Sequence, residues 1–109
     1  MTKLTAYTAD EVRDMLLQHL VHIARYWANL PDVDEATGHT HTVQDRCEGV
    51  LFSVLSTLDG ASMNLPGFDL HAMPHSEDKA FLQSEGERWI EPGTVISDTL
   101  HEHLWRFVK

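Results

Sequence analysis

The side chains that could perform chemistry in this sequence are mainly its eight histidines. His71 and His75 flank a long loop beside Asp78, and imidazole and carboxylate groups are the ligands that zinc and similar ions prefer. His19 and His22 lie one helical turn apart. His19 falls at the edge of an apolar stripe, however, so we predict a structural role for that pair. If the protein binds a metal, we expect the site near the loop over residues 60–78.

The remaining histidines are poorly spaced to share an ion. His101 and His103 are two residues apart, which places them about 200° apart around a helix. His39 and His41 could chelate weakly from an extended loop, but a solvated loop is the favoured interpretation. The sequence contains no C-x-x-C, H-E-x-x-H or comparable ligand spacing. It therefore predicts no metal-ligating residue and no cofactor.

Two pairs of carboxylates lie at helical spacing. Glu11 with Asp14, and Asp45 with Glu48, resemble the acidic pairs by which all-α nucleotide pyrophosphohydrolases bind magnesium. Both pairs lie near the N-terminal ends of their expected helices. In an antiparallel hairpin they would be separated by about 25–30 Å, whereas two catalytic metal ions lie about 4 Å apart. We therefore interpret them as first-turn acids favoured by the helix dipole.

Nucleophilic catalysis finds no support in the sequence. Cys47 is the only cysteine, and its place in the middle of an apolar stripe predicts a buried thiol that packs as a small hydrophobic group. Glu48, on the flank of that stripe, could act as a general acid or base. The favoured alternative is a surface ion pair with Arg46 or Arg25. No nucleophile elbow, P-loop or dinucleotide-binding motif is present.

A first long helix is expected from Thr8, which forms a capping box with Glu11, to Pro31. Its apolar stripe has helical period and comprises Val12, Leu16, Leu20, Ile23, Trp27 and Leu30. Three further apolar residues fall well outside the stripe: Leu17, Val21 and Ala24. Because a helix that is apolar over most of its circumference needs cover on more than one side, this helix is predicted to be central in the fold or to form a subunit contact.

A second long helix is expected from Thr42, with Asp45 in its first turn, to Gly60, a residue that commonly ends helices. One face is apolar and comprises Val43, Cys47, Val50, Leu51, Val54 and Leu58. Another face carries only small residues, namely Gly49, Ser53, Ser56 and Gly60. A ridge of small residues allows a neighbouring backbone to approach closely. Close packing inside the monomer and a dimer seam are both open interpretations.

Residues 60–76 have no helical period and predict a long, ordered loop with a turn at Pro66-Gly67. Trp89, with Phe68, is predicted to act as an apolar anchor that pins this loop to the helices.

Two shorter helices are expected near the C-terminus. Ser76 is the predicted cap of a helix that ends by Gly86, and Ser97 is the predicted cap of a terminal helix.

The composition limits the function classes. The 109 residues suit one domain, 1–109, and the net charge is −9. Binders of nucleic acids and of membrane surfaces need clustered basic residues, which are absent here, so neither partner is expected. No signal peptide or transmembrane segment is evident. With its single cysteine, the chain is predicted to be cytoplasmic.

Four short runs are the least generic part of the sequence: Leu55-Ser-Thr-Leu-Asp-Gly60, Leu65-Pro-Gly-Phe-Asp-Leu70, Pro74-His-Ser-Glu-Asp-Lys79 and Gly86-Glu-Arg-Trp89. In these runs the chain resembles a family of small, uncharacterised bacterial and phage-associated proteins. The resemblance spans residues 55–89 and implies no activity, so no functional residue is carried over from it.

The sequence therefore predicts an all-α fold: a small bundle of two long antiparallel helices, a long ordered loop with a short helix, and a C-terminal helix. The leading hypothesis is a non-enzymatic, self-associating interaction module, a homodimer, with another protein partner as a further option. The alternative is a small metal-dependent hydrolase or metal-binding protein that uses His and Asp/Glu near the 60–78 loop. A third hypothesis is an acidic inhibitor that mimics nucleic acid. No catalytic residue is predicted.

Overall fold

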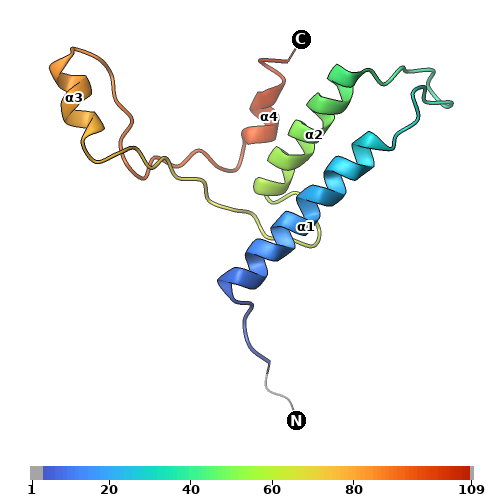
Figure 1. Ribbon diagram of the computed structural model, residues 1–109, viewed down its shortest axis with the longest axis horizontal. Coiled ribbons are helices and arrows are strands. Elements are labelled where there is room, and N and C mark those ends of the chain that lie inside the picture. Colours follow the sequence, from blue (N-terminus) through green and yellow to red (C-terminus); the bar gives the residue numbers. More distant parts are fainter. Residues whose placement is uncertain (1–3, 109) are drawn as a thin grey trace. The chain divides into compact units, whose positions relative to one another are not determined.

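The computed structural model describes residues 4–108, and this part of the chain contains four α-helices joined by loops (Figure 1). The helices are α1 (Ala9–Ala28), α2 (Val43–Leu58), α3 (Asp78–Ser84) and α4 (Leu100–Leu104). No β-strand forms within residues 4–108, where the extended segments meet only at two isolated bridges. The prediction of an all-α protein is confirmed.

The chain divides into two compact units at Leu55, inside α2. The first unit holds α1 and most of α2, with Val108. The second holds the last turn of α2, the long loop, α3 and α4. Each unit is described by itself below, and a single domain over residues 1–109 stays a prediction.

Helix α1 begins with the predicted capping box. The backbone N–H of Glu11 donates to Thr8 Oγ1 over 3.2 Å, and the backbone N–H of Thr8 donates to Glu11 Oε1 over 2.9 Å. These bonds satisfy two backbone donors at the helix start, and they hold the pKa of Glu11 below its usual value. The helix ends at Ala28, three residues before Pro31.

Within the first unit, α1 contacts α2 through Trp27. The indole Nε1 donates to Ser53 Oγ over 2.9 Å, and the six-membered ring lies over Gly49. Arg46 of α2 donates to the carbonyl oxygen of Trp27 over 2.7 Å and pairs with Asp32 over 3.2 Å. Of the two interpretations of the small-residue ridge, the structure shows packing inside the chain at Gly49 and Ser53.

Helix α2 starts and stops where the sequence predicts. Thr42 and Asp45 exchange reciprocal hydrogen bonds at its start. The pKa of Asp45 lies below its usual value, chiefly because its carboxylate accepts the hydrogen bond from the Thr42 backbone N–H. The helix ends at Leu58, and Gly60 then takes a left-handed φ of 92°. A Cβ on Gly60 would lie 3.1 Å from Cα of Gly67, so glycine is favoured there by both conformation and space.

In the second unit, the long loop pairs with a later segment of backbone. Ala72 exchanges hydrogen bonds with residues 93 and 94, at 2.9 and 2.8 Å, and the N–H of Ile96 donates to Leu70 over 3.0 Å. Residues 61–77 contain no helix, as predicted. The pairing with residues 93–96 was not predicted, because sequence periodicity reports only local structure.

Two predicted helix caps are wrong. The N-cap of α3 is Glu77, not Ser76, and that of α4 is Thr99, not Ser97; neither N-cap side chain makes a capping hydrogen bond. Ahead of α4, Asp98 adopts a positive φ of 83°, so the chain turns between Ser97 and the helix. Helix α3 does end before Gly86, as predicted.

The predicted role of Trp89 as a buried anchor is also wrong, because this residue is 38% exposed. Its Nε1 donates to Glu91 Oε1 over 2.6 Å, and Lys79 of α3 lies 5.5 Å from the ring centroid. Lys79 also pairs with Glu91 over 2.9 Å. Trp89 is thus held to α3 by polar and cation–π contacts rather than by burial.

Candidate functional site

The feature that stands out for function is the side of α1 that points away from Ile23, the buried residue of that helix. At 3.6 residues per turn, Val21 and Leu17 lie about 160° and 120° around the helix from Ile23. These two residues are 48% and 52% exposed. The sequence predicted that these residues need cover, and no other part of the first unit, as the structure describes it, provides it.

We define the outward face of α1 as the residues Asp14, Leu17, Gln18, Val21, His22 and Arg25. The last five of them line a groove of about 350 Å³. Positions four apart form ridges on a helix, and the space between two such ridges accepts a ridge of another helix. Here Leu17, Val21 and Arg25 form one ridge, and Gln18 and His22 form the other. The shape of the groove therefore suits a helical partner.

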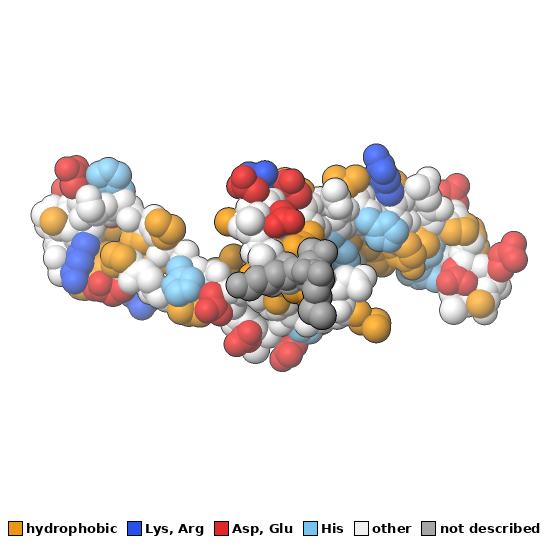
Figure 2. Space-filling model, turned by 90° about the horizontal axis from the view of Figure 1, so that it is seen from below, with side chains coloured by type: hydrophobic (Ala, Val, Ile, Leu, Met, Phe, Trp, Pro, Cys, Tyr) orange, Lys and Arg blue, Asp and Glu red, His pale blue; other side chains and the backbone are white. Residues whose placement is uncertain are grey.

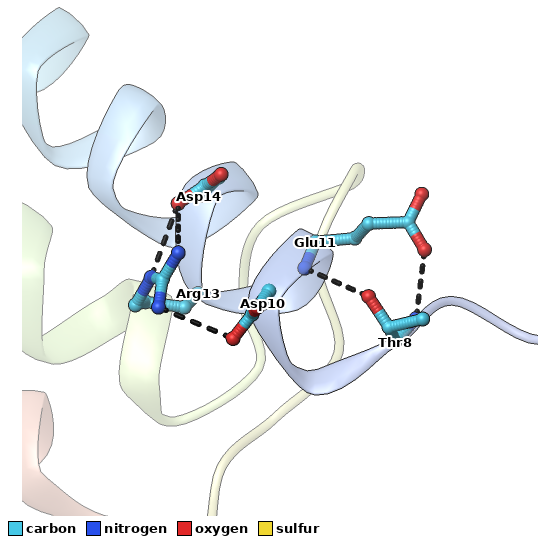
Figure 3. A network of polar contacts seen from close by, with 5 residues as sticks. All are labelled: Thr8, Asp10, Glu11, Arg13 and Asp14. Carbon is cyan, nitrogen blue, oxygen red and sulfur yellow. Dashed lines mark hydrogen bonds and ion pairs between the residues drawn. The ribbon is translucent and has the colours of Figure 1, made fainter.

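Charge on α1 is unevenly distributed along its length. At the N-terminal end, Arg13 bonds to Asp10 over 3.2 Å and to Asp14 over 3.0 Å, beside the capping Glu11 (Figure 3). Two carboxylates thus share one guanidinium, whereas the Glu11 carboxylate accepts the Thr8 N–H. With three carboxylates and one guanidinium, the first turns keep a net negative charge. At the other end lies Arg25, which no ion pair within residues 4–108 engages.

A second cluster, in the second unit, is the close pair of the Asp59 carboxylate and the His101 imidazole. The Asp59 side chain is 1% exposed, its Oδ2 lies 2.5 Å from His101 Nδ1, and it accepts the His101 backbone N–H over 2.8 Å. Burial alone would raise the pKa of Asp59, but hydrogen bonds from His101 and the Leu100 backbone, together with the charge interaction with His101, outweigh burial and lower the pKa.

A carboxylate on Nδ1 is the arrangement that orients imidazole in hydrolytic triads. In this chain, however, the same Asp59 oxygen also binds backbone at the start of α4. The pair therefore ties α4 to the turn after α2, and we interpret it as structural. No local pattern in the sequence predicts this pair, since the two residues are 42 positions apart.

The histidines do not assemble a metal site in the part of the chain that the structure describes, where no group of three or more His, Cys, Asp or Glu side chains could hold an ion. The imidazole of His75 accepts the Glu77 N–H over 3.3 Å, and Asp78 accepts the His75 N–H over 3.2 Å. In the acidic loop, the rings of His39 and His41 pack edge to face, 5.1 Å apart.

Two further site expectations are wrong. Cys47 is exposed rather than buried, because α2 turns its small-residue side, with Gly49 and Ser53, toward Trp27. Glu48 accepts a hydrogen bond from Gln44 over 2.8 Å. It does not pair with Arg46, whose guanidinium is engaged by the end of α1 and by Asp32.

Hydrophobic side chains are common on the surface of the described chain (Figure 2). Within residues 4–108, Ile23 and Leu65 are the large hydrophobic residues that are buried, each 7% exposed.

None of the described helices is long and apolar enough to span a bilayer.

No protein-family model, curated protein or solved structure matches this chain. The resemblance suggested by residues 55–89 therefore stays a prediction.

Proposed function

We propose that this protein is a non-enzymatic interaction module that self-associates through the outward face of α1. The observation that carries the proposal is the exposure of Leu17 and Val21, 52% and 48%, beside a groove shaped to receive a helix. Contiguous exposed apolar residues beside a groove are a feature of interaction sites when the patch is large. A reducing, cytoplasmic setting is part of the proposal and suits a lone, exposed Cys47.

The scarcity of buried hydrophobic residues within residues 4–108 supports the same proposal. A domain of this length has little stability to spare, and a partner that binds only the folded state adds stability by mass action. The finer arrangement, with α1 and α2 as an antiparallel pair, is also proposed. It is supported by contacts from Trp27, near the end of α1, to Gly49 and Ser53 of α2.

The area available predicts a weak association. Helix α1 has 20 residues and is therefore about 30 Å long. A strip of that length along one helix gives less contact than the roughly 1,200–2,000 Å² of a standard stable interface. We therefore expect a dissociation constant in the micromolar range or higher.

Sedimentation velocity over about 5–500 µM tests the proposal. We expect the weight-average mass to rise from that of the 12.4 kDa monomer toward twice that value. Leu17→Glu should abolish the rise, because it places a charge in the apolar groove. Its matched control is Leu51→Glu in α2, an exposed leucine of similar accessibility, 45%, which should leave association unchanged.

Circular dichroism of each variant verifies that the fold is intact. A parent protein that stays monomeric at 500 µM contradicts self-association. A dimer that Leu51→Glu disrupts and Leu17→Glu does not contradicts the choice of face.

A further inference from the structure

The residues along the outward face of α1 are arranged symmetrically about its centre. An acid, Asp14, lies toward the N-terminal end, the centre of the groove follows, and a base, Arg25, lies toward the C-terminal end. The midpoint of residues 14 and 25 is also the midpoint of Gln18 and Val21. A two-fold axis at this point maps the outward face of α1 onto itself and places each charge opposite its counterpart.

We infer that the partner of this face is a second copy of α1, packed antiparallel, with its two-fold axis between Gln18 and Val21. This inference rests on the proposed self-association and adds its orientation and register. In the pair, Gln18 of one copy lies against Val21 of the other, and Leu17 lies against His22. Asp14 of each copy lies opposite Arg25 of its partner.

The charges favour this orientation over a parallel one. A parallel pair would place the acidic first turns of both copies together, and the two Arg25 side chains as well. The antiparallel pair joins Arg25, which has no ion-pair partner within residues 4–108, to a region with three carboxylates and one guanidinium, where Arg13 pairs only with Asp10 and Asp14. The Asp14 side chain is 58% exposed, so it is accessible to the partner.

The distances are compatible with such pairs. Residues 14 and 25 lie 5.5 positions from the axis, or about 8 Å along the helix. The two helices diverge by only a few ångströms over that length at the crossing angle of about 20° that is common for paired helices. The long side chain of arginine spans such a separation. The interaction should therefore survive moderate variation in crossing angle.

Charge exchange tests the register. Arg25→Glu replaces two attractive contacts per dimer with two repulsive ones, so the dissociation constant should rise about 5- to 30-fold. Asp14→Lys should weaken the dimer similarly. The double variant Asp14→Lys/Arg25→Glu should return to within about 3-fold of the parent, because the opposite charges face each other again. In 0.5 M salt these differences should shrink, because the contacts are exposed.

Disulfide trapping tests the orientation directly in a Cys47→Ser background. We expect Gln18→Cys mixed with Val21→Cys to give a mixed disulfide dimer, identified by mass, while either variant alone gives little dimer. Disulfide dimers from each variant alone would show parallel helices and overturn this inference. A double charge variant whose dissociation constant does not return toward that of the parent would also overturn it. If Leu17→Glu still disrupts that dimer, the proposed function stands. A monomeric parent protein would refute both.

Discussion

A single methyl group placed on Gly49 should test the contact between the two long helices. An added Cβ would lie 2.5 Å from Trp27 Cζ3 and 2.6 Å from both Cε3 and Cη2. These are atoms of the rigid indole ring, whose Nε1 is bonded to Ser53. The ring therefore cannot move away without losing that hydrogen bond.

Two effects of Gly49→Ala oppose each other. Alanine is favoured over glycine inside a helix by about 0.5–1 kcal/mol. Overpacking typically costs about 1–3 kcal/mol, and three ring atoms at under 3 Å place this case in the upper part of that range. The net expectation is a loss of about 1–2 kcal/mol in the free energy of unfolding. The melting temperature should fall by about 4–8 °C.

Thermal and urea unfolding followed by far-ultraviolet circular dichroism measures the change, and a smaller ring provides the control. In a Trp27→Phe background the outer indole atoms are absent, so Gly49→Ala should cost much less or become favourable. Gln44→Ala, at an exposed position of the same helix, should have little effect. If Gly49→Ala raises the melting temperature of the parent protein, helix propensity dominates and the packing argument is refuted.

Three more substitutions test other contacts. Thr8→Ala removes half of the capping box and should cost about 1 kcal/mol, measured by urea unfolding; no change would indicate that the first turn does not contribute. Asp59→Asn removes a buried charge bonded to His101 and should cost about 2 kcal/mol at pH 7. Because folding lowers the pKa of Asp59, the stability it contributes is present above its unfolded pKa of about 3.9 and is lost as pH falls through its folded pKa. The difference from the parent should therefore shrink below about pH 4, and a constant difference would contradict this. Trp89→Ala should cost about 1 kcal/mol or less, as expected for an exposed cation–π contact, and a loss of 3–5 kcal/mol would instead indicate a buried tryptophan.

Local signals in the sequence were reliable where the structure they specify is also local. The capping box at Thr8, the start of α2 at Thr42 and its end before Gly60 each depend on residues within a few positions of one another. The backbone groups at a helix terminus need nearby partners, so the identities of those residues nearly determine the boundary. The same reasoning failed at α3 and α4, because several Ser, Thr, Asp and Glu residues precede each of these short helices.

Contacts between distant residues were not predictable from spacing. The pair of Asp59 and His101 and the pairing of residues 70–72 with 93–96 join parts of the chain that share no periodic pattern. Each depends on loop conformations, such as the positive φ of Asp98, that sequence periodicity does not encode. Consequently the histidine with the closest carboxylate partner is one that the spacing argument had set aside.

The two long helices show why an apolar stripe alone does not identify the buried side. The predicted stripe of α2 includes Val43 and Leu51, yet these are 78% and 45% exposed, whereas Gly49 contacts Trp27. Helix α2 therefore meets Trp27 of α1 through two of its small residues, Gly49 and Ser53.

The packing of α2 against Trp27 also determines which side of α1 is covered within the first unit. Trp27 packs beside Gly49 on the inner side of α1, and within the described part of the first unit nothing covers Leu17 and Val21 on the other side. The sequence predicted that these residues need cover because the polar arc of the helix is narrow. The structure adds that they border a single groove with an acid toward one end and a base at the other. This pattern is most simply completed by the same helix running in the opposite direction.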